Sequence, residues 1–212
     1  FTSQGITLQD FASLKNRIID SERNGYGTEL ADILSTIDEQ TAMDSETLKT
    51  RFWDMFIVDA LIGNWDRHNG NWGFLYNNAT DEVTLAPVFD CGSSLYPQAD
   101  EDLMKKILSD KNELNHRIFD IPLSAVTYNG KKINYFKFLS EGKFPDCNKA
   151  LKRIASRIDM KKIYEIIDNT PTITELQKEF YKTMLTARKE RIIDFSLNKL
   201  KEKSKKHDDM QR

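Results

Sequence analysis

The sequence lacks several features that mark whole classes of protein. Cysteine is scarce, and Cys91 and Cys147 have neither the density of a disulfide scaffold nor the spacing of a metal site. The N-terminus has no basic start followed by an apolar run, so we expect no secretion signal. The longest apolar stretch, around residues 55–62, is too short to span a membrane and contains Asp59. The low cysteine content leads us to expect a cytoplasmic protein. Because the net charge is only −2, we expect it to bind neither nucleic acid nor a membrane.

Helical patterning is what the sequence has in quantity. Hydrophobic residues make up 39% and charged residues 30% of the chain, ordinary proportions for one globular domain. Apolar residues recur at helical spacing from Leu8 to Ile19, after Thr28, and from Asp44 to Ile62. The third of these helices is apolar around most of its circumference, so we expect it to be buried. Further helices are predicted over residues 100–109, 146–158, 160–167 and 172–203, the last with a capping box of Thr174 and Gln177.

Two short hairpins are predicted between the helices. Trp72 to Tyr76 and Val83 to Ala86 are strand-like segments on either side of a polar turn. Ala125 to Tyr128 and Lys132 to Tyr135 flank Asn129-Gly130, a pair that suits a two-residue primed turn. We therefore predict a mainly α fold with two short β-hairpins.

The segment around the first hairpin carries the most informative residues. From Leu61 to Leu95 the sequence reads LIGNWDRHNGNWGFLYNNATDEVTLAPVFDCGSSL. Phosphoryl transfer needs a carboxylate beside the attacking hydroxyl and hard oxygen ligands that hold magnesium against the phosphates. Asp66 and Asn71 have the spacing D-x-x-x-x-N of a protein-kinase catalytic loop. Asp90-Cys91-Gly92, across the hairpin, stands where the metal-binding Asp-Phe-Gly of a kinase would be.

This combination resembles the C-terminal region of the HipA-like kinases, toxin-type serine/threonine kinases of bacteria. That family combines an Ile-Gly-Asn-x-Asp-x-His-x-x-Asn loop, a hairpin, and an Ala-Pro-x-Tyr-Asp metal motif. The same order occurs here between about Ala60 and Leu95, with Phe89 in place of the Tyr. The resemblance implies a protein-kinase-like C-terminal lobe with a catalytic loop over residues 64–71 and a metal motif over residues 90–92. It also implies Mg²⁺ as cofactor, ATP as co-substrate, and a protein substrate and an antitoxin as partners.

The resemblance implies roles for single residues as well. Asp66 is the expected catalytic base, and Asn71 and Asp90 are the expected magnesium ligands, through which they would also hold the nucleotide. His68 is assigned to catalysis, where it would help to position the transferring phosphate; a hydrogen-bonding brace for the loop is the alternative. For Arg67 an activation-loop carboxylate, a phosphate and a surface ion pair all stay open as partners. Three residues are expected to support the site: Asn64, Arg67 and Gly92.

A phosphate cradle is missing before Asp66. The sequence has no G-x-G-x-x-G and no Val-Ala-x-Lys run there, and Asn24-Gly25-Tyr26-Gly27 lies between two predicted helices, the wrong context for such a loop. We therefore expect residues 1–203 to form the helical lobe alone, inactive by itself, followed by a disordered tail over residues 204–212. Either the nucleotide lobe precedes a hinge at Phe1 to Gly5, or another chain supplies it.

Two other functions stay open. A lipid or small-molecule kinase is one, because Asp-Arg-His-Asn-x-Asn is also close to the catalytic loop of phosphoinositide kinases. Gly-Asn before Asp66 and Ala-Pro before Asp90 favour the HipA-like interpretation, and no basic membrane-facing patch is evident. The other is a non-catalytic interaction module that keeps the kinase fold. The intact set of Asp66, Asn71 and Asp90 argues against that alternative.

Overall fold

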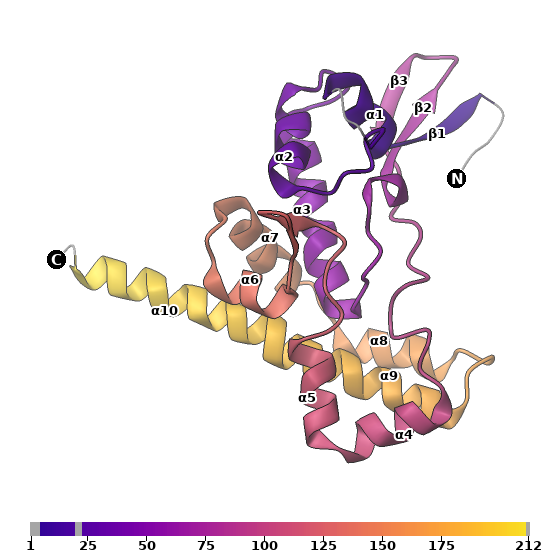
Figure 1. Cartoon of the computed structure of the whole chain (residues 1–212), viewed down its shortest axis with the longest axis vertical. Coiled ribbons are helices and arrows are strands. Elements are labelled where there is room, and N and C mark those ends of the chain that lie inside the picture. Colours follow the sequence, from indigo (N-terminus) through magenta and orange to yellow (C-terminus); the bar gives the residue numbers. More distant parts are fainter. Residues whose placement is uncertain (1–4, 20–22, 211–212) are drawn as a thin grey trace.

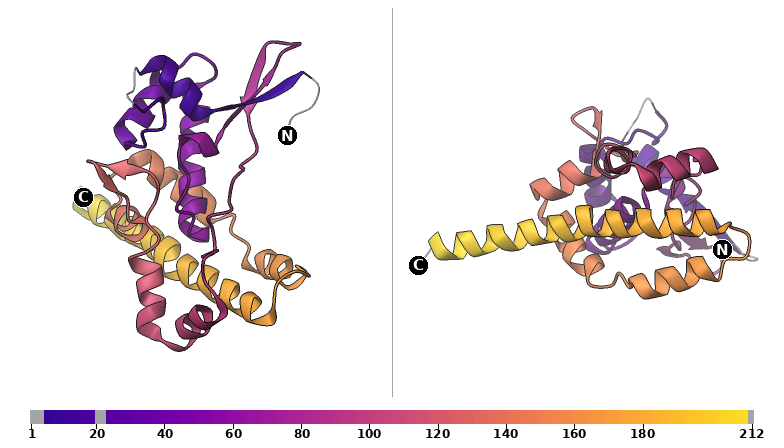
Figure 2. Two further views of the ribbon diagram at one scale, coloured as in Figure 1. Left: turned by 45° about the vertical axis from the view of Figure 1, so that its right-hand side comes forward. Right: turned by 90° about the horizontal axis from the view of Figure 1, so that it is seen from below.

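A long central helix organises the molecule. The computed structural model describes residues 5–19 and 23–210, apart from the side chains of residues 206–210. Helix α3 (Ser45–Ile62) runs through the middle, with α1, α2 and a small sheet towards one end and the remaining helices towards the other (Figure 1). The last helix, α10, extends away from this body (Figure 2). No helix within the described ranges is long and apolar enough to cross a bilayer.

The predicted burial of α3 is confirmed. The helix begins where the Asp44 side chain accepts a hydrogen bond from the N–H of Thr47 at 2.8 Å, and it ends at Gly63 in the left-handed conformation. Half of its residues are buried, including one carboxylate: Leu48, Phe52, Trp53, Met55, Phe56, Ile57, Asp59, Ala60 and Leu61. Because α3 is held on nearly all sides, the polar loop that follows it starts from a rigid point.

The first hairpin is confirmed, but it belongs to a larger sheet. Strands β2 (Gly73–Asn77) and β3 (Glu82–Leu85) pair antiparallel, with Phe74 opposite Leu85. A third strand, β1 (Ile6–Asp10), pairs with the other edge of β2. The prediction of helix from Leu8 is therefore wrong for the first three residues. Pairing with a strand more than sixty positions away satisfies the backbone there, and local spacing does not reveal it.

The second hairpin is also confirmed, in a shorter form. Strands β4 (Thr127–Tyr128) and β5 (Lys131–Lys132) are joined by Asn129 and Gly130, both with positive φ, as a primed turn requires. The carboxylate of Glu29 accepts hydrogen bonds from both turn N–H groups, at 2.8 and 3.0 Å. The predicted returning strand does not reach Tyr135, because α6 (Tyr135–Glu141) begins at that residue.

The remaining helices follow the predictions with three differences. Helix α5, close behind α4, is not among the predicted helices, and neither is α6. The predicted long C-terminal helix is interrupted after α9 by a π-helical turn, η2 (Lys189–Asp194), while its capping box of Thr174 and Gln177 is confirmed. The bounds are α1 Phe11–Ile18, α2 Leu30–Glu39, α4 Glu101–Ser109, α5 Lys111–Phe119, α7 Pro145–Ala155, α8 Met160–Asp168, α9 Glu175–Arg188 and α10 Phe195–Met210.

Two predictions concern the ends of the chain. Helix α10 continues to Met210, into the segment 204–212 for which a disordered tail is predicted, and residues 211 and 212 lie outside the described residues. Of the predicted hinge at Phe1 to Gly5, all but Gly5 also lies outside them.

Candidate active site

Asp66 lies in the loop between α3 and a single 3-10 turn, η1 (Asn69–Asn71). Its backbone is held from both sides. Its N–H donates to Oδ1 of Asn64 at 3.1 Å, and its carbonyl accepts from the N–H of His68 and from Nδ2 of Asn71, both at 2.8 Å. The half-buried carboxylate has no hydrogen-bond or ion-pair partner among the described residues. A rigid backbone that presents a free carboxylate is suited to accept a proton from a bound hydroxyl.

Asn64 is completely buried and connects the loop to the core. Its side-chain Nδ2 donates to Oδ1 of Asp59 at 2.9 Å, and its carbonyl accepts from the hydroxyl of Tyr135 at 2.6 Å. Because its Oδ1 also accepts a hydrogen bond from the N–H of Asp66, Asn64 fixes the start of the loop through three hydrogen bonds.

The partner of Arg67 is none of those expected from the sequence: it is the carboxylate of Asp59, which is buried on α3, seven positions before Asp66. Arg67 Nε lies 3.1 Å from Oδ2 and Nη2 lies 3.2 Å from Oδ1 of Asp59, and both side chains are almost fully buried. Burial raises the pKa of the Asp59 carboxyl, and Arg67 and Asn64 partly offset this effect. Burial by itself would lower the pKa of the Arg67 guanidinium, but its contacts with the Asp59 carboxylate and with Cys91 outweigh burial and raise that pKa. The guanidinium therefore stays charged, and a surface ion pair is excluded for Arg67.

The same guanidinium joins the catalytic loop to the predicted metal motif. Arg67 Nη1 donates to the carbonyl of Asn71 at 2.7 Å and also to the carbonyl of Phe89, the residue before Asp90. Nη2 contacts Sγ of Cys91, the residue after Asp90, at 3.2 Å. One buried side chain thus links Asn71 to the residues on either side of Asp90.

The side-chain oxygens of Asn71 and Asp90 are suitable ligands for magnesium. Nδ2 of Asn71 is used by the carbonyl of Asp66, which leaves its Oδ1 without a hydrogen-bond donor among the described residues. The carboxylate of Asp90 is exposed and has no ion-pair partner there either. The described residues contain no cluster of three or more His, Cys, Asp or Glu side chains that could enclose an ion. Magnesium prefers such an open site, with one or two protein oxygens and the rest from phosphates and water.

Asp90 has an unusual backbone conformation, with φ of +53°. Two further non-glycine residues in the segment after it, Leu95 and Tyr96, are also left-handed, each at a cost of roughly 1–3 kcal/mol. Such conformations concentrate at functional segments, where the surrounding contacts hold them in place. Gly92 is exposed, and a Cβ at this position would come no closer than 3.9 Å to Asp90, so nothing in the fold itself requires glycine there.

His68 has a bracing contact. Its Nδ1 accepts a hydrogen bond from the N–H of Gly70 at 3.0 Å and so caps the turn η1. A neutral ring in this arrangement carries its proton on Nε2. The ring also packs edge-on against Tyr26, with centroids 5.9 Å apart. The brace is therefore present, and the predicted catalytic role of His68 would have to come from Nε2.

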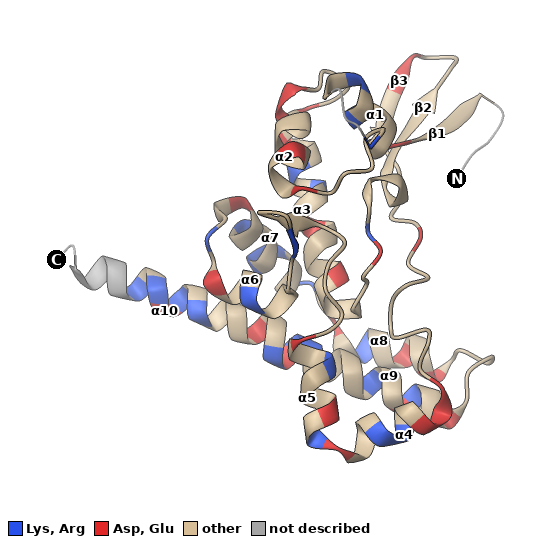
Figure 3. Cartoon of the chain, in the orientation of Figure 1, with Lys and Arg blue, Asp and Glu red and all other residues tan. Residues whose placement is uncertain are grey.

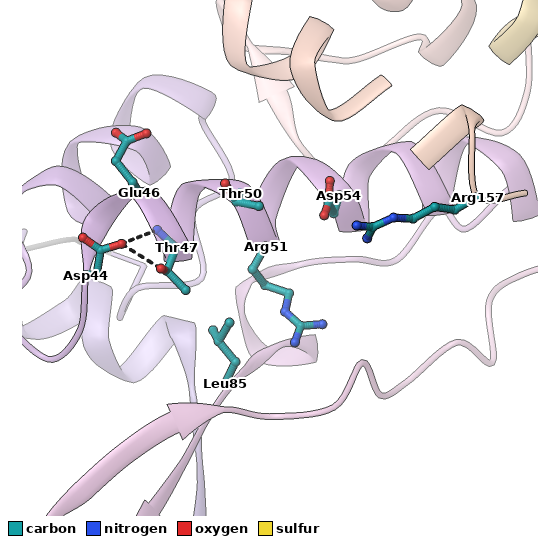
Figure 4. A pocket seen from close by; sticks show the side chains of 8 residues that line it. All are labelled: Asp44, Glu46, Thr47, Thr50, Arg51, Asp54, Leu85 and Arg157. Carbon is teal, nitrogen blue, oxygen red and sulfur yellow. Dashed lines mark hydrogen bonds between the residues drawn. The ribbon is translucent and has the colours of Figure 1, made fainter. Parts of the chain in front are cut away.

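A cleft of about 510 Å³ lies elsewhere on the molecule. It is lined by α3 from Asp44 to Asp54 together with Leu85 and Arg157, and Figure 4 shows Arg51 pointing towards Leu85. None of the predicted site residues lines it.

Comparison with known proteins identifies the family. The family model described as HipA-like C-terminal domain matches residues 3–175, most of the chain. The chain belongs to this family. It is 50% identical over 208 residues to the serine/threonine-protein kinase CtkA of Helicobacter pylori, an alignment that covers 98% of this chain and 64% of the relative. The crystal structure of the Helicobacter pylori proinflammatory kinase CtkA matches 96% of this chain and 74% of that one, with a TM-score of 0.93 at 50% identity. The predicted kinase-like fold is confirmed.

Within this HipA-like domain, the residue that the sequence prediction missed is Asp59. In the sequence, Asp59 is only a charge that interrupts an apolar run. A carboxylate on a helix that is otherwise buried needs a cationic partner, and Arg67 lies eight positions further along the chain, in the loop after the helix. That reasoning could have found the pair. The carbonyls of Asn71 and Phe89, which complete the guanidinium's contacts, carry no sequence signal at all.

Replacing Arg67 by Met is expected to destabilise this domain by about 3–5 kcal/mol, because it leaves the buried Asp59 carboxylate without a counter-charge. Urea unfolding of the variant measures the loss. Arg153→Met is the matched control: its partner Asp54 is also on α3, but that pair is partly exposed, so about 1 kcal/mol is expected. The double variant Asp59→Asn with Arg67→Met should recover part of the loss. A single-variant loss below about 1 kcal/mol would contradict the central role given to this pair.

Proposed function

We propose that the chain is the catalytic lobe of an ATP- and magnesium-dependent serine/threonine protein kinase of HipA-like type. The observation that supports the proposal most is the set of contacts around Arg67: its guanidinium contacts the carbonyls of Asn71 and Phe89, and the Asn71 side chain contacts the backbone of Asp66. The relative of 50% identity is named a serine/threonine-protein kinase, which supports the same activity. The chain spans about two thirds of that relative's length, 64%.

Each residue has a part in the proposed reaction. The Asp66 carboxylate orients the acceptor hydroxyl and takes up its proton as the hydroxyl oxygen forms a bond to the γ-phosphorus. The bond from that phosphorus to the bridging oxygen breaks, and ADP leaves with the electron pair. Oδ1 of Asn71 and the carboxylate of Asp90 would hold magnesium, which when bound neutralises charge on the phosphates. Asn64, Arg67 and His68 keep the loop in position through the contacts described above.

The acceptor is proposed to be a protein hydroxyl. A lipid kinase would need a basic surface beside the catalytic loop to attract an anionic membrane. Figure 3 shows Lys and Arg spread over several helices, α4, α8, α9 and α10 among them, with Asp and Glu on the helices of the body. Transfer of labelled phosphate from ATP, followed by analysis of the labelled amino acids, tests the proposal. Label on serine or threonine supports it, and label confined to lipid or small-molecule acceptors overturns it. An antitoxin partner and a cytoplasmic location stay predictions.

The nucleotide lobe is proposed to lie outside these 212 residues, in the same protein or in a second one. This follows from the lack of a Gly-rich strand turn and a strand Lys, which hold the phosphates in kinases. Residues 1–212 alone should therefore bind Mg-ATP with a dissociation constant weaker than roughly 100 µM, measured by isothermal titration calorimetry. Submicromolar binding would show that the chain holds a complete nucleotide site.

A further inference from the structure

A short loop from another part of the chain lies against the catalytic loop. This loop, residues 23–28, is called the Tyr26 loop below. Nδ2 of Asn69, in η1, donates hydrogen bonds to the carbonyls of Gly25 and Gly27 at 2.7 and 2.8 Å. Nζ of Lys15, on α1, donates to the same Gly27 carbonyl at 2.7 Å. The Tyr26 loop is therefore held on both sides of its tip.

Holding this loop uses two buried polar side chains. Asn69 and Lys15 are each only 1% exposed, and burying such groups is costly unless they are hydrogen-bonded. Gly25 is equally constrained: its φ is +79°, and a Cβ there would lie 1.9 Å from the carbonyl oxygen of Ala12. Two buried polar side chains and a glycine therefore hold the tip of the loop in one backbone conformation.

The tip carries an exposed aromatic side chain, Tyr26. Its ring is 51% exposed and lies beside the His68 ring at 5.9 Å, two residues from Asp66. The Tyr26 ring can approach the catalytic loop this closely because residue 70 is glycine: a Cβ there would lie 2.8 Å from the ring. A large exposed aromatic on a backbone held rigid is characteristic of residues that contact a partner, because little conformational entropy is lost on binding.

We propose that Tyr26 is a specificity-determining residue that contacts the protein acceptor, packing its ring against an apolar side chain next to the serine or threonine hydroxyl. The inference rests on the proposed kinase function. We expect an apolar contact because the ring itself offers an apolar face. Lys15, a buried cation near the loop, is not free to pair with an acidic acceptor, because it already contacts the Gly27 carbonyl and lies 3.7 Å from Asp32. We expect one aromatic ring to favour an acceptor with an apolar side chain by roughly 10-fold in kcat/KM, the low end for an apolar contact.

Two serine peptides test this in a form of the protein that includes the nucleotide lobe. They differ only beside the serine, with leucine in one and glycine in the other, presented on each side in turn. We expect the unchanged protein to favour leucine on one side by roughly 10-fold in kcat/KM, mainly through KM. Tyr26→Ala should reduce that preference to about twofold, and Tyr26→Phe should restore it, since the ring makes the contact. Phe195→Ala, which removes an exposed aromatic on α10, should leave the preference intact.

The outcomes separate this inference from the function on which it rests. If the unchanged protein phosphorylates neither peptide nor any protein acceptor, the proposed function and the inference both fail. If it phosphorylates them but shows no leucine preference, or if Tyr26→Ala keeps the preference, only the role of Tyr26 is overturned. A thermal melt of Tyr26→Ala that stays within about 2 °C of the unchanged protein rules out a folding defect as the cause.

Discussion

Replacing Asp66 by Asn is expected to lower phosphate transfer by about 10²–10⁴-fold while Mg-ATP affinity changes by less than about threefold. The carboxylate acts on the acceptor hydroxyl and not on the nucleotide, so its loss should appear in turnover alone. Asn fills the same volume, and the backbone contacts to Asn64, His68 and Asn71 involve the main chain of Asp66, which the substitution leaves in place. The loop should therefore keep its shape.

The measurement uses a form of the protein that carries the nucleotide lobe. Single-turnover transfer and equilibrium binding of Mg-ATP are compared for the unchanged protein and for Asp66→Asn. Asp102→Asn serves as the control, because that carboxylate is 98% exposed and lies on α4. Near-normal turnover in Asp66→Asn would show that the base is another group. Equal losses in turnover and ATP affinity would place Asp66 at the nucleotide instead of the acceptor.

Local sequence patterns predicted the elements whose stability is decided locally. Helix α3 could be recognised because its apolar residues, the Asp44 cap and the terminal Gly63 agree with one another. The hairpin at Asn129-Gly130 could be recognised because that pair suits the required positive φ values. The spacing of Asp66, Asn71 and Asp90 predicts their common role, and the loop and hairpin expected between them are present.

Long-range contacts account for what the sequence did not reveal. Strand β1 exists because β2 offers a free edge, and the residues from Leu8 look helical without that partner. In the sequence, the Tyr26 loop shows only the wrong context for a phosphate cradle. In the structure it lies against the catalytic loop, where Asn69 donates hydrogen bonds to two of its carbonyls. These contacts join positions that are more than 40 residues apart, and no local propensity encodes them.

Replacing Asp90 by Asn should give a different pattern from Asp66→Asn, because it should impair both nucleotide binding and turnover. Asp90 and Asn71 are the proposed oxygen ligands, and magnesium binds a carboxylate far better than a second neutral amide. Since metal ions contribute several kcal/mol to phosphoryl transfer, turnover should fall by roughly 10³-fold and Mg-ATP affinity by at least about 10-fold. The side chain is exposed and unpartnered in the described residues, so stability should change by less than about 0.5 kcal/mol.

Magnesium dependence distinguishes the two carboxylates. If Asp90 holds the ion, a roughly tenfold rise in magnesium concentration should restore part of the activity of Asp90→Asn by mass action. The same rise should do nothing for Asp66→Asn, because the missing group there is a proton acceptor. Asp102→Asn again controls for a general effect of removing a surface charge. An Asp90→Asn variant with normal Mg-ATP affinity, or one whose loss is independent of magnesium, would remove Asp90 from the metal site. The contact of Arg67 with the Phe89 carbonyl would then have only a structural role.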